Sequence, residues 1–442
     1  MPRSLPPVFQ HPYQHGLIDA QAAIAAGHFT AREYIESCID RTLLVESRVG
    51  AFAYFDADRV RTQIDDHTFA ANGRLANMPI GIKDIIDTRG VVTAMGSAAF
   101  HGHIPDHSAW VVNALAAQAA IMFGKTVTTE FAWREPGKTR NPWHLDHTPG
   151  GSSSGSAAAV ACGSVPAALG TQTLGSVIRP AAFCGVVGYK PSFGAIPRAG
   201  IYPMSDSLDQ VGVFTRSVAD AARLTACLWA TTKDEAEARG GSAPPRVALI
   251  HTSRWDRASR EQQQLIDDTA RRLREHGAEI TLVELPAAFD AIWDVAATLC
   301  DVEGAQVNGR FLLDQPPRVS RPILELIARG QALAATDYQQ AKTIQQSLIR
   351  QFHDLMAPFD AALTAPARGE APLGLAGTGD AVFCIPFSVL GGPAITLPAA
   401  TSANGLPLGI QLVNRWGDDQ RLIKTAMWVE ARLARPQTFP LL

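Results

Sequence analysis

The chain has 442 residues, of which 46% are hydrophobic and 18% are charged, and its net charge is −3. This composition is typical of a folded globular protein and excludes a largely disordered chain. Lysine and arginine are scattered rather than gathered into a basic stripe, so we expect neither a nucleic-acid nor an anionic-membrane partner. The six cysteines form no C-x-x-C pair, which favours reduced thiols over a disulfide framework or a zinc site.

The beginning of the chain has no signature of export. Residues 1–16 are rich in proline and lack the apolar stretch of a signal peptide. No run of 18 apolar residues occurs anywhere in the chain. We therefore expect a cytoplasmic protein without a membrane partner.

The first 77 residues predict helices and one short strand. Thr30 and Glu33 form a capping box, and apolar residues follow it at helical spacing. We expect helices at 17–26, from Thr30 onward and at 57–71, with a strand at Phe52–Phe55.

Composition changes at Met78, and residues 78–200 are rich in glycine, serine, alanine and threonine. An apolar strand is predicted at 79–82, and it ends at Lys83. The remaining expectations for this part are a helix at 108–120, a strand at 120–123, a long loop at 133–149 and a tightly packed helix at 156–163.

The second half of the chain alternates strand and helix. A strand at Arg246–His251, an amphipathic helix at 262–276 and a strand at 279–285 predict a crossover unit with parallel pairing. Helices are expected over 289–355 with a proline-containing break at 315–321. Further strands are predicted at 361–365, 394–397 and 408–413, and a closing helix at 418–433.

These elements predict an α/β fold with a mixed, mostly parallel central sheet flanked by helices on both faces. No linker or internal repeat divides the chain, so we expect one domain over 1–442. Within it, 78–200 is the candidate catalytic core, and 286–357 is a helical elaboration near the substrate pocket.

The segment P-G-G-S-S-S-G-S at 149–156 has three interpretations. A flexible linker is disfavoured because the segment runs directly into an alanine-rich helix. A nucleophile elbow centred on Ser153 matches G-x-S-x-G, but no buried strand precedes it. A backbone cradle at a helix start remains, where free N–H groups favour developing negative charge.

Two further segments carry candidate chemistry. In G-T-Q-T-L-G-S-V-I-R-P at 170–180, small and hydroxyl residues surround Ser176, and the segment is either a cradle of N–H donors or a polar turn. In G-I-K-D at 81–84, Lys83 follows an apolar strand. A lysine at a strand end is usually solvated, but a buried lysine has a lowered pKa and acts as a base at neutral pH.

Together the three segments resemble the amidase signature family in order and register. That family has a lysine in a G-x-K-D motif, a GGSSGGS-like segment about seventy residues later, and then a GTDxGGSxRxP-like segment. Further matches include G-K-T at 124–126, F-C-G at 183–185 and L-P-L-G-I-Q at 406–411. The resemblance covers nearly the whole chain.

The resemblance implies an acyl-enzyme mechanism with no cofactor and no metal. Ser176 would be the nucleophile, and Ser152, after a cis peptide bond, would bridge it to Lys83. The backbone N–H groups that hold the oxyanion would belong to Thr173, Leu174, Gly175 and Ser176. Substrate-binding residues would be Thr129, Glu130, Phe131, Gly150 and Gly151, with further walls from the loop to Pro149 and from 293–311.

The sequence departs from the family pattern at four positions. Ser154 stands where glycine is usual, and Gln172 replaces a common aspartate. Leu174 replaces a glycine in the oxyanion turn, which matters if that position needs a positive φ. Ile178 occupies the usual arginine position, and an arginine follows it.

The resemblance implies an amidase that hydrolyses a carboxylic amide C–N bond, with esters and carbamates as further carbonyl substrates. We expect a small-molecule amide, ester or carbamate as the partner and no nucleic acid, with a homodimer as the one assembly considered. The alternative within the family is a glutamine-dependent amidotransferase subunit that works on charged transfer RNA within a complex. A non-catalytic binding protein is disfavoured because all three triad positions are filled.

Histidine groups at 101–107 and 144–147 offer a metal site as a rival interpretation. No H-E-x-x-H motif occurs, so solvated histidines are the expectation.

Overall fold

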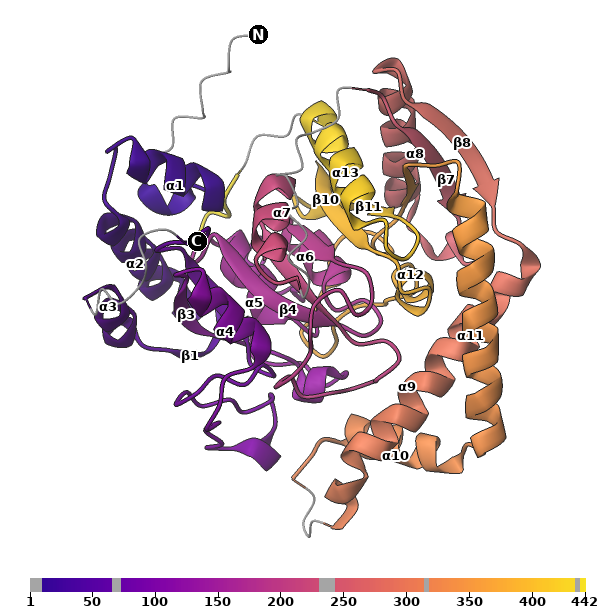
Figure 1. Ribbon diagram of the computed structural model, residues 1–442, viewed down its shortest axis with the longest axis horizontal. Coiled ribbons are helices and arrows are strands. Elements are labelled where there is room, and N and C mark those ends of the chain that lie inside the picture. The colour runs from indigo at the N-terminus through magenta and orange to yellow at the C-terminus, as the bar shows by residue number, and fades with distance from the viewer. Residues whose placement is uncertain (1–9, 66–72, 230–242, 314–317, 434–437) are drawn as a thin grey trace.

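Eleven strands lie side by side in one sheet in the computed structural model, which describes residues 10–65, 73–229, 243–313, 318–433 and 438–442. The strand order is β1-β3-β2-β4-β6-β5-β10-β11-β9-β7-β8 (Figure 1). The strands are β1 (Phe52–Phe55), β2 (Pro79–Lys83), β3 (Ile121–Thr126), β4 (Ala167–Gln172), β5 (Val187–Lys190), β6 (Gln210–Thr215), β7 (Arg246–His251), β8 (Glu279–Glu284), β9 (Ala361–Thr364), β10 (Ala394–Thr401) and β11 (Pro407–Val413).

The expected mixed sheet is confirmed, but parallel pairs are the minority among the described strands and not the majority that was predicted. Among the described strands, four neighbouring pairs are parallel and six are antiparallel. Parallel pairs occur in two groups, β3-β2-β4 and β9-β7-β8. The second group includes the predicted crossover, in which β7 and β8 are joined through an amphipathic helix.

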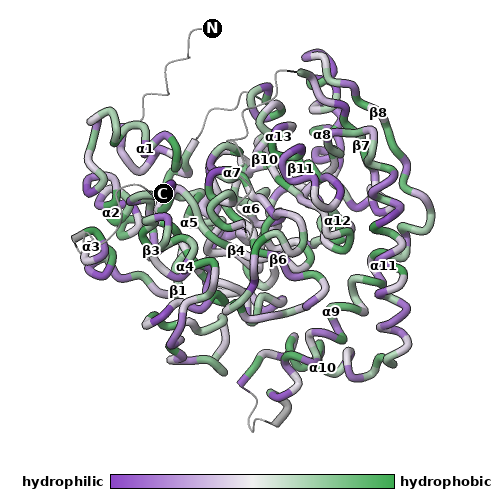
Figure 2. The backbone as a smooth tube through the Cα atoms, in the orientation of Figure 1, coloured by the Kyte–Doolittle hydropathy of each residue, from purple (hydrophilic) through white to green (hydrophobic). Residues whose placement is uncertain are grey.

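Helices pack against this sheet. They are α1 (Leu17–Ala25), α2 (Ala31–Val49), α3 (Ala57–Asp65), α4 (Trp110–Ala117), α5 (Ser154–Ala161), α6 (Ile178–Cys184), α7 (Val218–Ala226), α8 (Arg260–Glu275), α9 (Ile292–Asn308), α10 (Arg321–Ala332), α11 (Ala335–Met356), α12 (Ile385–Val389) and α13 (Asp419–Leu433). One contacting pair is α5 with α6, and another is α7 with α13. Along α8 and α11, hydrophobic and hydrophilic residues alternate, as in helices that cover a core with one face (Figure 2).

Most element boundaries agree with the sequence-based prediction to within a few residues. The capping box is present: the Thr30 side chain accepts from the Glu33 N–H, and α2 starts directly after it. Of the helix predicted at 57–71, residues 66–72 lie outside the described part of the chain, as do residues 314–317 of the predicted break. Within the described residues, no helix is both long and apolar enough to cross a membrane.

The helical region at 286–357 contains α9, α10 and α11, which pack on one another. In Figure 1 these helices extend along one side of the molecule, next to the end of the sheet that carries β7 and β8. Helix α9 also contacts the short helix α12.

Helix α5 begins inside the serine-rich segment and is buried throughout. Gly155 in its first turn donates its N–H to the Val127 carbonyl at 3.0 Å. A Cβ atom at Gly155 would lie 2.2 Å from the Ala51 carbonyl oxygen and 2.3 Å from the Val127 nitrogen. The glycine therefore permits direct contact between helix and strand backbones, which a flexible linker would not need.

We predict that Gly155→Ala lowers the free energy of unfolding by about 3 kcal/mol, because backbone atoms on both sides must move to admit the methyl group. Alanine is otherwise the better helix former. The matched control is Gly309→Ala, a helix-end position with φ −55°, where an added Cβ would meet nothing within 4 Å. Denaturant unfolding of both variants measures the difference, and equal stability of the two would contradict this account of α5.

Candidate functional site

The three segments singled out in the sequence meet at one edge of the sheet. Lys83 is the last residue of β2, and β2 is the parallel neighbour of β4. The carboxyl ends of parallel neighbours lie at the same edge, so the residues that follow β4 are brought next to Lys83. Ser152 lies just before α5, and Ser176 lies just before α6.

Lys83 is fully buried and hydrogen-bonded to hydroxyl groups. Its Nζ lies 2.8 Å from Ser152 Oγ and 2.8 Å from Thr171 Oγ1. Burial lowers the pKa of Lys83 well below its usual range, and the negative charge of Asp209 acts in the opposite direction. An amine in these surroundings is able to be neutral and to accept a proton.

The segment around Ser152 is held from both sides. The Gly151–Ser152 peptide bond is cis, as the resemblance implies. The Thr129 N–H donates to the Ser152 carbonyl at 3.1 Å, and Arg179 Nη2 donates to the Gly151 carbonyl at 2.6 Å. Ser152 is only 1% exposed, so its hydroxyl has a fixed position beside Lys83.

Ser176 is the most exposed of the three predicted catalytic residues, at 9%. Within the part of the chain that the structure describes, its hydroxyl makes no hydrogen bond. The backbone N–H groups of the four predicted oxyanion donors, at 173–176, likewise have no acceptor among the described residues. Buried N–H groups are seldom left unpaired, so four successive free donors beside a free hydroxyl form a suitable cradle for an oxyanion.

Of the four departures, Leu174 is the nearest to these donors. It is half-buried and packs against the core. It is not among the described non-glycine residues with positive φ, so this turn does not require glycine for its backbone angles. Ser154 is buried and donates to the Val127 carbonyl at 3.3 Å, and Ile178 is fully buried.

A cavity of about 250 Å³ adjoins this site through Thr171, the hydrogen-bond partner of Lys83, although none of the three predicted catalytic residues lines it. Thr171 and Thr173 line it, and most of its other lining residues come from 198–211. Asp209 in that stretch accepts from Thr173 Oγ1 at 2.6 Å and from the N–H groups of Met204 and Ser205 at 2.7 and 3.0 Å. Burial raises the pKa of Asp209.

The predicted pocket walls contribute little to this cavity, since only Ala132 of them lines it. Thr129, Glu130 and Phe131 are buried supports behind it. Glu130 accepts from Ser97 Oγ at 2.6 Å, and Phe131 is stacked against Tyr202, which does line the cavity. Phe131 and Ala132 both have positive φ, so the chain turns sharply there, and Ala132 is the residue of this turn that reaches the cavity.

The two predicted glycines of the serine-rich segment allow close packing. Gly150 has φ +81°, and a Cβ there would lie 2.7 Å from Pro180 Cα. A Cβ at Gly151 would lie 2.7 Å from Thr378 Cγ2. Both positions therefore accept only glycine without rearrangement.

Arg179 is a buried cation at the same place, 6% exposed. Besides Gly151 it contacts Thr378 Oγ1 at 3.2 Å, and its Nε has no hydrogen-bond partner among the described residues. Burial lowers the pKa of Arg179. A guanidinium with a free buried N–H is able to donate to an oxygen of a bound molecule.

The nucleophile elbow is not supported. Ser153 is fully buried, its hydroxyl donates to the Thr171 carbonyl at 3.1 Å, and no strand directly precedes it. Among the described residues, no group of three potential ligands could hold a metal ion. His147 instead contacts the Ala371 carbonyl at 2.7 Å.

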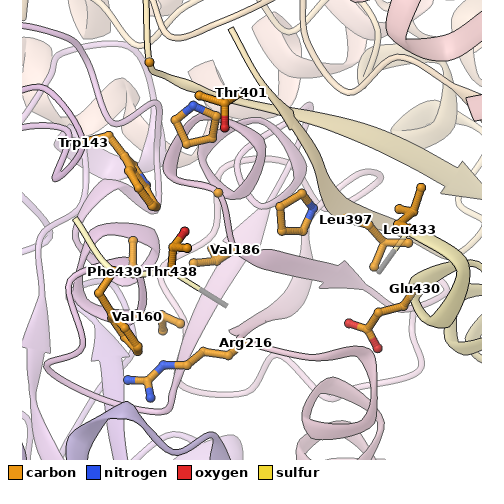
Figure 3. A pocket seen from close by; sticks show the side chains of 15 residues that line it. Trp143, Val160, Val186, Arg216, Leu397, Thr401, Glu430, Leu433, Thr438 and Phe439 are labelled. Atoms are coloured by element: carbon orange, nitrogen blue, oxygen red, sulfur yellow. The ribbon is translucent and has the colours of Figure 1, made fainter. Parts of the chain in front are cut away.

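A second cavity, of about 120 Å³, lies at the opposite ends of the same two helices (Figure 3). It is lined by Val160 and Ala161 near the end of α5 and by Gly185, which caps α6. Arg216 and Glu430 are its charged lining residues (Figure 3). Its lining includes none of the three predicted catalytic residues and neither Thr171 nor Thr173, and it shares no lining residue with the first cavity, so it is separate from the candidate site.

Sequence reasoning missed two residues next to Lys83. Thr171 could have been found, because it alternates with Thr173 and residues two apart on an extended segment point the same way. Asp209 had no local signal, because it reaches the site only through the antiparallel pairing of β4 with β6.

Comparison with known proteins identifies the class. The sequence model of the family described as Amidase matches residues 33–423. The chain therefore belongs to the amidase signature family, and its sheet and helices are those of that family's fold.

Two solved structures are similar over nearly the whole chain. One, described as the crystal structure of an amidase, has a TM-score of 0.85 and 29% identity and covers 95% of this chain and 100% of its own. The native peptide amidase from Stenotrophomonas maltophilia has a TM-score of 0.80 and 28% identity, with 98% and 99% covered.

Relatives among characterised proteins carry a different name, that of a glutamyl-tRNA(Gln) amidotransferase subunit. The one from Shouchella clausii (strain KSM-K16) is 30% identical, covering 94% of this chain and 96% of its own length. The protein of the same name from Prochlorococcus marinus (strain MIT 9313) is 33% identical, covering 91% and 94%.

These relatives contradict the expectation of a small-molecule partner and no nucleic acid. They are named as subunits of an enzyme for transfer-RNA-linked glutamate. The expectation came from the scattered charges of the whole chain. An average over the whole chain is a poor guide to a nucleic-acid partner, because it does not describe the local charge of any one surface.

We predict that Leu174→Gly lowers the free energy of unfolding by about 1–2 kcal/mol, because it removes half-buried apolar surface and adds backbone freedom. The control is Leu174→Met, which conserves volume and should stay close to the unchanged protein. A more stable glycine variant would show that the leucine backbone is strained after all. We also expect the ratio of kcat/KM for a bulky and a small acyl donor to change in the glycine variant.

Proposed function

We propose that this protein cleaves the C–N bond of a carboxylic amide through an acyl-enzyme on Ser176, with Ser152 and Lys83 as the proton relay. The observation that carries the proposal is the buried Lys83 amine, 2.8 Å from Ser152 Oγ. Ser176, whose hydroxyl makes no hydrogen bond to the described residues, follows β4, the parallel neighbour of the strand that carries Lys83. Nucleophilic serine needs an adjacent base, and a lysine with a lowered pKa is such a base.

In this mechanism neutral Lys83 accepts the Ser152 proton while Ser152 accepts the proton of Ser176. Ser176 Oγ attacks the carbonyl carbon, and the free N–H groups at 174–176 hold the oxyanion. The C–N bond then breaks, and the relay returns the proton to the leaving nitrogen. Water attacks the acyl-serine, which releases the carboxylic acid and restores Ser176. Esters and carbamates present the same carbonyl to the nucleophile.

The helical region at 286–357 is proposed to support the substrate pocket from outside. Glu303 of α9 accepts from the Ser207 N–H at 3.0 Å and from the Ser205 hydroxyl. Asn308 accepts from the hydroxyl of Tyr202 at 2.9 Å. These contacts hold the stretch at 202–207, which provides much of the cavity wall.

A second candidate is the role of an amidotransferase component, in which glutamine is the amide that is cleaved and charged transfer RNA receives the nitrogen. The names of the relatives favour it, whereas Gln172 and Leu174, which replace the usual aspartate and glycine, count against it. Ammonia release from glutamine, compared with release from a panel of primary amides, separates the two. Preference for glutamine, increased by partner subunits and glutamyl-tRNA, supports the amidotransferase.

We predict that Ser176→Ala lowers kcat for amide hydrolysis by at least about 10³-fold, because it removes the nucleophile. Ser153→Ala is the matched control, a buried serine in the neighbouring segment, and it should retain activity to within about tenfold. Released ammonia and circular dichroism are measured on both variants. Loss of activity in Ser153→Ala alone would instead identify Ser153 as the nucleophile.

The lowered pKa of Lys83 sets the pH profile. Protonated Lys83 accepts no proton, so kcat/KM should fall as pH decreases below the pKa and stay level above it. Because that pKa lies well below the usual 10.5, we predict a plateau at alkaline pH before pH 10. A lysine with an ordinary pKa would produce a continuing rise of about tenfold per pH unit from pH 7 to 10, and that profile would contradict the proposed base.

A further inference from the structure

Ser388 lies behind the segment at 173–176, on the short helix α12. It is 1% exposed. Its Oγ donates to the Leu174 carbonyl at 2.8 Å and accepts from Gln172 Nε2 at 3.0 Å. A serine hydroxyl has one proton, so these two bonds have a defined direction, from Gln172 through Ser388 to Leu174.

Gln172 holds the other end of the same segment. Its Oε1 accepts from the N–H groups of Val177 and Ile178, at 2.9 and 3.0 Å. One buried amide side chain therefore connects, directly or through Ser388, to backbone groups on both sides of Gly175 and Ser176. The N–H groups at 177 and 178 are occupied, whereas those at 174–176 are left without an acceptor among the described residues.

The bond from Ser388 also sets the direction of one free donor. The Leu174 carbonyl and the Gly175 N–H belong to one peptide unit, which is trans. In a trans unit these two groups point in opposite directions. Because Ser388 holds the carbonyl, the Gly175 N–H must point away from α12. Rotation of this peptide would turn the carbonyl, rather than the N–H, toward an oxyanion and repel it.

Packing on the same side limits other arrangements. A Cβ at Gly175 would lie 3.0 Å from the Cβ atoms of both Ala381 and Cys384. The backbone at Gly175 thus already contacts the start of α12 closely. The hydrogen bond from Ser388 and this close packing together fix the position of the peptide unit between Leu174 and Gly175.

We propose that Ser388 is a positioning residue for the oxyanion donors, and that Gln172 acts through it. This inference rests on the proposed amide-cleaving function. Gln172 stands where aspartate is common in the family's motif, and a carboxylate could accept from residues 177 and 178 but could not donate to Ser388. Because the Gln172 amide donates a hydrogen bond to Ser388, the Ser388 hydroxyl can use its own proton to donate to the Leu174 carbonyl.

The main test is Ser388→Ala, with Ser388→Thr as the control that keeps the hydroxyl. Steady-state kinetics on a primary amide, followed by the released ammonia, are combined with inhibition by a trifluoromethyl ketone of the same acyl group, which forms a tetrahedral oxyanion on a serine. We expect kcat to fall at least about tenfold in Ser388→Ala while KM stays within about twofold, since the lost interaction matters only in the transition state. Inhibition by the ketone should weaken by a similar factor, and Ser388→Thr should retain most of kcat.

Gln172→Glu is a second variant in case Ser388→Ala does not fold. It keeps an acceptor for residues 177 and 178, removes the donor to Ser388 and adds a buried negative charge near the oxyanion. Both changes act against the oxyanion, so a loss of kcat at least as large, without a change in KM, is expected. Thermal unfolding of each variant checks that the fold is intact. A Ser388→Ala protein with kcat within about twofold of the unchanged protein, or an equal loss in Ser388→Thr, would overturn the inference. Unchanged protein that neither hydrolyses amides nor binds the ketone would instead overturn the proposed function.

Discussion

The site depends on a lysine amine that has been removed from water. Lys83 is fully buried, and among the described residues only hydroxyl groups lie within hydrogen-bond distance of its amine, which disfavours its charged form. The neighbouring lysine, Lys125, shows the contrast. It is equally buried, but it lies 3.6 Å from the Asp84 carboxylate, and its pKa is lowered only to about 8. Two buried lysines on adjacent parallel strands thus differ in pKa, because Lys125 has a carboxylate within ion-pair distance. The one without it is suited to accept a proton.

The second requirement is a set of backbone N–H groups that have no hydrogen-bond acceptor among the described residues. The turn at 173–176 leaves four successive N–H groups without an acceptor among the described residues, an arrangement that is costly unless the surrounding structure holds it. Contacts from distant parts of the chain do so: Asp209 binds the side chain of Thr173, and Ser388 binds the Leu174 carbonyl. The free donors are therefore maintained by residues that are far away in sequence.

Family membership and biological role are separate conclusions here. The proposed mechanism describes only how an amide carbonyl is attacked, and this chain resembles both a protein named as a peptide amidase and proteins named as an amidotransferase subunit. What receives the nitrogen depends on surfaces outside the motifs. This is why the composition led to the wrong expectation about nucleic acid, although the family itself was recognised from three short segments.

The sequence by itself determined the family, the mixed α/β fold and most helices and strands with strong periodicity, such as α8 and β7. It also located Lys83, Ser152 and Ser176, because the motifs that contain them are local. Strands β4 and β6 escaped prediction, since buried strands in a sheet covered on both sides do not alternate between apolar and polar residues. Only the tertiary structure decided which residues surround the site. Thr171, Asp209 and Ser388 come together through strand pairing and the packing of α12, and such contacts between residues distant in sequence leave no periodic pattern in the chain.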